Sequence, residues 1–148
     1  NRFLRKSINI YGEAFLKTIG KQQYGEGTYE NGLQYINQLS KLVGIDTHAV
    51  HIFDGSGLSP QNRITPNALC KYLYYAAQAP WSKSFYNALP IINGLPMKSG
   101  SIHQTRAYTG YAKSASGKQY IYSIVAHNYD GAGKEMQAQL WKILDVLK

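Results

Sequence analysis

The first half of the chain repeats apolar residues every three or four positions, which is the spacing of amphipathic helices. Three stretches carry this pattern and end at a glycine or proline: residues 9–20, 29–43 and 66–79, which stop at Gly20, Gly44 and Pro80. Thr28 and Thr65 stand where the second and third helices need an N-cap, and Pro66 suits the first helical position. The pattern therefore predicts three helices, with a short strand over residues 49–53 and a short helix and turn over residues 81–94.

From Lys98 onward the period falls to two, which indicates strands. We expect strands containing residues 97–112 and 118–128 to pair across the turn-forming stretch SASG at 114–117. Apolar positions return to helical spacing over residues 132–147, which predicts a helix packed across the strands. Helices, then an antiparallel sheet, then a closing helix make an α+β fold of one domain, or of part of a larger one.

The chain of 148 residues has a formal net charge of +8, from 16 Lys and Arg against 8 Asp and Glu. An excess of this kind favours an anionic partner: a nucleic acid, a membrane surface or a carboxylate-bearing polymer. The basic residues are scattered with no run longer than two, so no nucleic acid is expected. The single cysteine, Cys70, rules out an internal disulfide and a CxxC metal pair, and the histidines lack HExxH spacing. Neither a metal nor another cofactor is expected.

The stretch Ser7-Ile8-Asn9 offers a hydroxyl and an amide two positions apart. In an extended backbone, side chains at i and i+2 point the same way, so Ser7 and Asn9 would face one cleft. The alternative is structural, because the stretch directly precedes a predicted helix and the Ser7 hydroxyl would then be its N-cap.

The stretch Lys98-Ser99-Gly100-Ser101 puts a cation, a hydroxyl and a glycine at the start of the strand pattern. On a strand, Lys98 shares one face with Gly100, and the two serines share the other. Gly100 lets another molecule approach the backbone closely, and a cation beside a hydroxyl suits a carboxylate. A free N–H on Ser101 suits an oxyanion. The alternative is an exposed lysine on a strand with a bulge glycine.

A third stretch, DGSGLSPQNRITP at residues 54–66, is a loop of glycines and small polar residues, which is typical of close backbone contact. In this order, the three stretches resemble the C-terminal part of the D-alanyl-D-alanine carboxypeptidase/endopeptidase family. These are the class C low-molecular-mass penicillin-binding proteins of peptidase family S13. The stretches KSINIYGEAFLKTIG, DGSGLSPQNRITP and KSGSIHQTRAYTGYAKSASGKQYIYSIVAHNY are similar to its Ser-x-Asn, Asp-Gly-Ser-Gly-Leu-Ser and Lys-Thr-Gly motifs, so the resemblance covers almost all of the chain.

The resemblance implies a β-lactamase/transpeptidase-like fold, here incomplete, and an acyl-enzyme formed when a Ser-x-x-Lys serine attacks a D-Ala-D-Ala carbonyl. It implies that Ser7 relays a proton toward the leaving amine and that Asn9 binds a substrate amide. It also implies that Lys98 supplies positive potential to the terminal carboxylate, which the Ser99 hydroxyl binds. The Ser101 N–H would be one oxyanion donor, on a strand edge that docks substrate like an added β-strand.

One departure from the family pattern matters most, because no Ser-x-x-Lys occurs in this sequence. We therefore expect residues 1–148 to be the C-terminal portion of a catalytic domain, inactive alone and partnered by a missing N-terminal half of the same protein. Such a piece would expose a sheet edge, which invites a homodimer. Ser99 replaces the family's usual Thr but keeps the hydroxyl, and Pro60 stands where many relatives carry Arg.

The expected partners are peptidoglycan stem peptides and β-lactams, in an extracytoplasmic location such as the periplasm or cell envelope. Two alternatives remain open. A serine β-lactamase or esterase of the same fold would share the Ser-x-Asn and Lys-Ser-Gly motifs, although the Asp-Gly-Ser-Gly-Leu-Ser stretch favours the peptidase. A catalytically dead wall-binding module would keep the cleft and lack the nucleophile.

Overall fold

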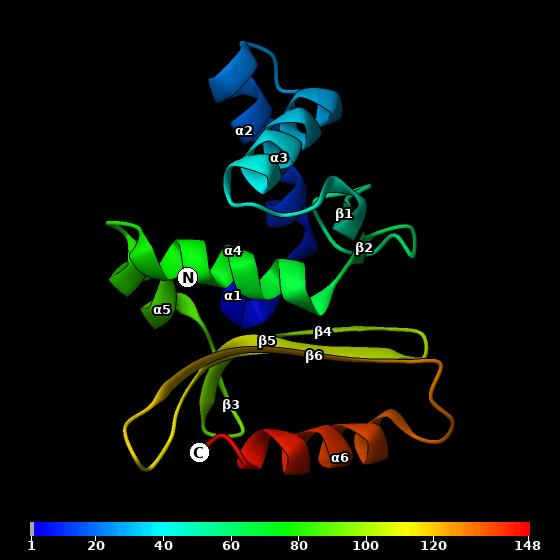
Figure 1. Ribbon diagram of the computed structural model, residues 1–148. Helices are drawn as coiled ribbons and strands as arrows, with labels where there is room; N and C mark the ends of the chain where they lie inside the picture. Colours follow the sequence, from blue (N-terminus) through cyan, green and yellow to red (C-terminus); the bar gives the residue numbers. More distant parts are fainter. Residues whose placement is uncertain (1) are drawn as a thin grey trace.

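The computed structural model describes residues 2–148, which form an antiparallel sheet with helices on both faces (Figure 1). The helices before the sheet are α1 (Arg2–Lys6), α2 (Asn9–Tyr24), α3 (Tyr29–Leu42), α4 (Pro66–Gln78) and α5 (Ser82–Ala88). Between α3 and α4 lie a 3-10 turn (Thr47–Ala49) and a small ribbon of β1 (Val50–His51) and β2 (Arg63–Ile64). The sheet contains β3 (Ile91–Ile92), β4 (Leu95–Ile102), β5 (Thr105–Lys113) and β6 (Gln119–His127), and α6 (Gly133–Asp145) follows.

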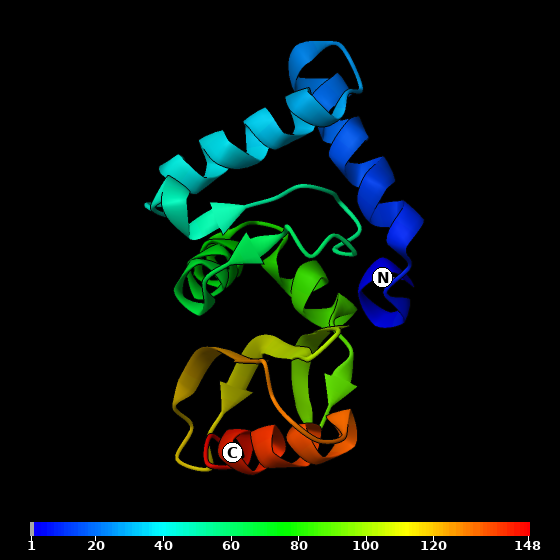
Figure 2. The ribbon, with the colours of Figure 1, turned by 90° about the vertical axis from the view of Figure 1, so that its right-hand side faces the viewer.

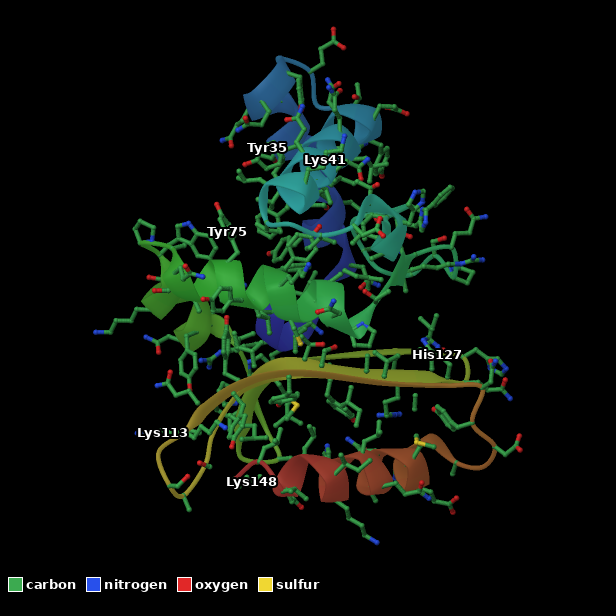
Figure 3. All side chains as sticks on the ribbon, viewed as in Figure 1. Tyr35, Lys41, Tyr75, Lys113, His127 and Lys148 are labelled. Atoms are coloured by element: carbon green, nitrogen blue, oxygen red, sulfur yellow. The ribbon has the colours of Figure 1, made fainter. Side chains whose placement is uncertain are left out.

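The larger sheet has the order β3-β4-β5-β6, and each neighbouring pair is antiparallel. Helix α4 covers one face and α6 the other, while the pair α2–α3 lies beyond α4 (Figures 1 and 2). Lys113 and His127 mark opposite ends of the β5–β6 pair (Figure 3). The predicted α+β order of helices, antiparallel sheet and closing helix is confirmed.

The predicted helix starts are confirmed, but the predicted stop at Gly20 is wrong. Thr28 and Thr65 cap α3 and α4, each with its hydroxyl accepting a backbone N–H at 3.2 Å. Helix α2 continues past Gly20 and ends at Gly25, whose φ of 86° is the left-handed conformation of a helix terminus. A Cβ at Gly20 would lie 2.9 Å from the backbone nitrogen of Gly32, so this glycine allows α2 and α3 to pack closely.

Residues 97–112 were predicted as one strand, and the structure shows that they belong to two. Strand β4 ends at Ile102, and the chain reverses at His103 and Gln104 into β5, with Ile102 paired to Thr105. Gln104 has a φ of 47° in this tight turn. The alternating pattern missed the reversal because neither turn residue is the Gly, Asn or Asp that usually marks one. The second predicted turn, at 114–117, does join β5 to β6.

The main core lies between the sheet and α6. Its buried members are Leu95, Met97, Tyr108, Ala112, Tyr122, Leu140 and Leu144. On the opposite face, the Tyr111 hydroxyl donates to the carbonyl oxygen of Leu73 at 2.8 Å and so ties β5 to α4. A smaller cluster of Ile45, Val50 and Ala68 packs the β1–β2 ribbon against α4. Along residues 2–148, no helix combines the length and the apolar character that crossing a membrane requires.

Replacing Met97 by Ala is expected to destabilise the fold by about 2–5 kcal/mol, because the side chain is fully buried and a cavity would remain. Ile91 is the matched control, since it lies on the neighbouring strand β3 with 68% of its surface exposed. Ile91→Ala should change the free energy of unfolding by no more than about 0.5 kcal/mol. Urea unfolding of the three proteins measures the difference, and equal losses in both variants would contradict this assignment of the core.

Candidate functional site

Ser7 and Lys98 meet although 91 positions of sequence separate them. The Lys98 ammonium donates a hydrogen bond to the Ser7 hydroxyl at 2.9 Å, and it also donates to the carbonyl oxygen of Ser99. Ser7 lies in the turn between α1 and α2, where its φ is 51°. The Arg5 guanidinium donates to the carbonyl oxygen of Asn87 at 3.0 Å, which attaches α1 to the end of α5. The turn that carries Ser7 is thus held beside the sheet.

The structure separates the two interpretations of the Ser7-Ile8-Asn9 stretch. Ile8 occupies the N-cap position of α2 and no side chain caps the helix, so Ser7 does not serve as an N-cap. The assumption of an extended segment is also wrong, because Ser7 is left-handed and Asn9 is already helical. Across residues 2–148, no hydrogen bond joins the Asn9 amide to Ser7 or Lys98. The structure therefore brings Ser7 to Lys98 and leaves the role of Asn9 a prediction.

Strand β4 has one edge paired with β5, and beyond Met97 its other edge is open. The Met97 N–H donates to the carbonyl oxygen of Pro90 at 3.0 Å, on the side of β3. Because backbone groups alternate along a strand, the N–H groups of Ser99 and Ser101 point to the same outer side. Strand β3 pairs with β4 only through Leu95 and Pro96, so this stretch of edge has no strand partner within residues 2–148. These N–H groups are therefore available to an added strand, and the binding of a peptide there stays a prediction.

Gly100 is exposed on this strand, opposite Ala107 of β5. The nearest atom to a Cβ built on Gly100 is the Ala107 Cβ, at 4.0 Å. The packing of the chain itself therefore does not require glycine here. The prediction that another molecule approaches the backbone at Gly100 remains consistent with the structure.

A cavity of about 320 Å³ opens at this edge. It is lined by Ser7, Ile92, Ser99, Gly100, Ser101, Arg106, Tyr108 and Gln137. Lys98 adjoins it through the hydrogen bond to Ser7, whereas Asn9 does not line it. Four larger hollows, of about 380 to 600 Å³, lie elsewhere and contain none of the predicted site residues. The sequence motifs, rather than cavity size, identify the site.

Sequence reasoning missed three polar residues that line this cavity: Arg106, Tyr108 and Gln137. Arg106 and Tyr108 follow Lys98 in the strand pattern, but their approach to the cavity depends on the hairpin turn at Gln104. Gln137 comes from α6. The only available signal was the two-residue period that puts Arg106 and Tyr108 on one face of the sheet.

Two cations border the cavity, Lys98 and Arg106, and neither forms an ion pair within residues 2–148. Burial lowers the pKa of the Lys98 ammonium below its ordinary value, because desolvation disfavours the charged form. Within residues 2–148, the ion pair that closes to 4.0 Å or less joins Asp145, the last residue of α6, to Lys148. Lys98 therefore has a hydroxyl and a carbonyl as acceptors and no ionic partner. An amine in this state suits proton transfer with a neighbouring hydroxyl.

The loop of residues 54–59 folds around the carboxylate of Asp54. Asp54 accepts hydrogen bonds from the N–H groups of Gly57 and Ser59, from the Ser56 hydroxyl and from the Asn62 side-chain amide. Burial alone would raise the pKa of Asp54, but these hydrogen bonds outweigh it and hold the pKa below its ordinary value. The loop is thus an internally bonded structure, and its side chains do not reach the cavity described above.

The same loop docks on α2, directly after the turn that carries Ser7. Glu13 accepts the N–H of Ser56 at 2.9 Å, and a Cβ at Gly12 would lie 2.0 Å from the carbonyl oxygen of Gly55. The backbones of α2 and the loop are therefore in contact, as the glycine-rich stretch predicted. The loop supports the start of α2 and, through it, the position of Ser7.

No group of three or more His, Cys, Asp or Glu side chains that would hold a metal ion occurs among the described residues 2–148. Cys70 is half-buried on α4, and burial raises the pKa of its thiol. The thiol is therefore protonated at neutral pH, which agrees with a packing role.

The fold matches that of the penicillin-binding proteins. Penicillin binding protein 4 from Haemophilus influenzae, solved in complex with a β-lactam, superposes with a TM-score of 0.84 at 18% identity, over 99% of this chain and 40% of that protein. A second structure of the same protein gives a TM-score of 0.78 at 16% identity, over 95% of this chain and 38% of that one. At this identity the match establishes the fold.

The family model described as D-Ala-D-Ala carboxypeptidase 3 (S13) matches residues 1–95, so the chain belongs to this family. The matched part contains the Ser-x-Asn and Asp-Gly-Ser-Gly-Leu-Ser motifs and ends before Lys98. The family predicted from the three motifs is confirmed.

Two curated relatives extend over most of the chain. A D-alanyl-D-alanine carboxypeptidase from Actinomadura is 27% identical over 87% of this chain and 28% of its own length. Carboxypeptidase DacB from Mycolicibacterium smegmatis is 23% identical over 90% of this chain and 34% of its own length. The chain thus spans about a third of the length of these relatives.

The Asp54 loop predicts a loss of stability in acid. Because the folded pKa of Asp54 lies below the ordinary value of 3.8, its stabilisation is complete above that pH and is lost as the pH falls through the folded pKa. Asp54→Asn should lower stability at pH 7 by about 2 kcal/mol and weaken the loss below pH 4. Thermal unfolding at pH 7, 5 and 3 tests this against Asp130→Asn, which removes an exposed carboxylate outside the loop. The same acid profile in wild type and Asp54→Asn would refute the prediction.

Ser7→Ala is expected to lower the pKa of Lys98 further, because the ammonium would lose a hydrogen-bond acceptor. A titration of the Lys98 side chain by NMR, assigned with Lys98→Arg, measures this change. Ser101→Ala is the control, since that hydroxyl makes no hydrogen bond to Lys98 among the described residues. If Ser7→Ala leaves the pKa of Lys98 where it is, the two side chains do not meet in solution.

Proposed function

We propose that this chain forms one wall of the active site of a serine-type D-Ala-D-Ala carboxypeptidase that acts on peptidoglycan stem peptides through an acyl-enzyme. The observation that carries the proposal is the hydrogen bond from Lys98 to Ser7 at an open strand edge. An amine and a hydroxyl in contact form a short path for a proton, which an acyl transfer needs at its leaving group. Membership of the S13 family supports the same chemistry.

The roles follow from the geometry and the family. Ser7 passes a proton to the leaving amine, and Lys98 sets the protonation state of that hydroxyl. The outward N–H of Ser101 stabilises the oxyanion, and the peptide lies along β4 as an added strand. The Ser99 hydroxyl binds the terminal carboxylate, and Gly100 leaves room for the peptide. Asn9, at the first position of α2, binds a substrate amide in this proposal.

The nucleophile comes from a part of the enzyme outside these residues, because this sequence contains no Ser-x-x-Lys. The relatives are about three times as long as the matched region, which leaves ample sequence for it. The outer edge of β6 has no strand partner within residues 2–148, and the remaining strands of the sheet would pair there. Because the substrate is a wall polymer, the enzyme works in the periplasm or cell envelope.

The proposal predicts a covalent adduct with penicillin only when a Ser-x-x-Lys segment is present. Intact-mass spectra of the 148-residue chain should show no adduct, and a longer polypeptide that includes the preceding segment should gain the mass of one drug molecule. In that longer protein, Lys98→Ala should slow acylation by about 10²–10⁴-fold, because the proton path is broken. Lys113→Ala, at the far end of β5, is the control and should acylate at the wild-type rate.

The outcomes separate the other functions. Rapid loss of the adduct with turnover of penicillin would indicate a β-lactamase or esterase. No adduct on a folded longer protein would refute the peptidase and favour a wall-binding module without catalysis.

A further inference from the structure

Arg106 lies on β5 directly opposite Ser101 of β4. Residues of one face alternate along a strand, so Arg106 shares the α6-facing side with Tyr108, which is buried in the main core. Its side chain lines the same cavity as Ser99 and Ser101. Within residues 2–148, Arg106 is the one arginine that lines this cavity, and it lies outside the Ser-x-Asn and Lys-Ser-Gly motifs.

The guanidinium of Arg106 has more donors than the protein satisfies. Its Nε atom is buried and has no hydrogen-bond partner among residues 2–148. Its Nη1 atom donates to the Tyr108 hydroxyl at the long distance of 3.4 Å, and the Tyr129 hydroxyl is a second acceptor for the guanidinium. Within residues 2–148, no carboxylate lies within 4.0 Å of it. Arg106 as a whole is half-buried, but a buried donor without an acceptor is costly, and an anion from outside residues 2–148 would satisfy it.

The guanidinium of Arg106 lies against the start of α6. A Cβ at Gly133 would lie 2.9 Å from Arg106 Nη2 and 3.3 Å from the Tyr129 hydroxyl, so the guanidinium packs directly over the first residue of α6. No side chain caps this helix, whose N-cap is Ala132. The free N–H groups at a helix start add positive potential. Glu135 lies in the first turn of α6, and both it and Asp130 are exposed.

We propose that Arg106 is a specificity-determining residue that binds the terminal carboxylate of the substrate, together with the Ser99 hydroxyl. Both side chains belong to the α6-facing side of the sheet, and both line the cavity. Lys98 points to the other face, where it contacts Ser7. The two cations thereby have separate roles: Arg106 binds the carboxylate, and Lys98 takes part in the proton transfer with Ser7.

This assignment rests on the proposed function and makes it more specific. A planar guanidinium binds a carboxylate with two parallel hydrogen bonds, which a lysine ammonium does not reproduce. The enzyme should therefore discriminate strongly between a peptide with a free C-terminal carboxylate and the same peptide as an amide.

The experiment measures binding of N-acetyl-D-Ala-D-Ala and of its C-terminal amide to the 148-residue chain by NMR. The acid should bind about tenfold more tightly than the amide in wild type. Arg106→Gln should abolish that preference by weakening the acid alone, and Arg106→Lys should restore part of it because the charge remains. Arg63→Gln removes an exposed arginine of β2 and should leave the preference unchanged.

Each other outcome overturns the assignment. Equal weakening of acid and amide in Arg106→Gln would show that Arg106 supports only the fold, which thermal unfolding of both Arg106 variants would reveal independently. Wild-type protein that binds acid and amide equally, or binds neither, would show that no carboxylate site exists here.

The penicillin adduct of the longer protein reports on the proposed function separately. An adduct without discrimination at Arg106 would overturn the inference and leave the peptidase standing. If the preference for the acid over the amide depends on Arg106 but no penicillin adduct forms, the carboxylate site stands and the proposed peptidase is refuted.

Discussion

The contact between α2 and the loop of residues 54–59 is the constraint on which the candidate site depends. Gly12 and Gly55 bring two backbones together more closely than any side chain would permit. The Glu13 carboxylate on α2 also accepts hydrogen bonds from N–H groups of the loop. Ser7 lies five residues before Gly12, at the turn that starts α2. The loop of residues 54–59 does not line the cavity, but it helps to position the Ser7 hydroxyl, which does. The attachment of α1 to α5 through Arg5 holds the same turn. The Asp54 carboxylate matters because it gives that loop one conformation.

The alternation of side chains along β4 is the second feature that arranges the candidate site. Successive side chains of β4 point to opposite faces, so Lys98 reaches the helical side where Ser7 lies, and Ser99 turns toward α6. The backbone contributes a third direction, because the N–H of Ser101 points out from the open edge. One short strand thereby offers a proton path, a hydroxyl and an oxyanion donor to a peptide that lies beside it.

The chemistry proposed for this edge depends on polar groups that lack hydrogen-bond or ionic partners within residues 2–148. Among residues 2–148, Lys98 has no ionic partner, Arg106 has a buried donor without an acceptor, and the edge N–H groups of β4 have no strand beside them. Folding normally removes such features, since each costs free energy when it is buried unpaired. Their occurrence together at one cavity supports the assignment of a ligand to it. The family membership and the fold similarity are consistent with that assignment.

The sequence by itself determined the local elements and the motif-bearing residues. Periodicity and capping residues such as Thr28 and Thr65 identified the helices, because these signals act over a few neighbouring positions. Only the tertiary structure decided which distant residues meet. The reversal at Gln104 has no sequence marker, and it alone brings Arg106 opposite Ser101. The contact of Lys98 with Ser7 and the packing role of Gly20 likewise depend on how separate elements approach one another, and no local pattern encodes that approach.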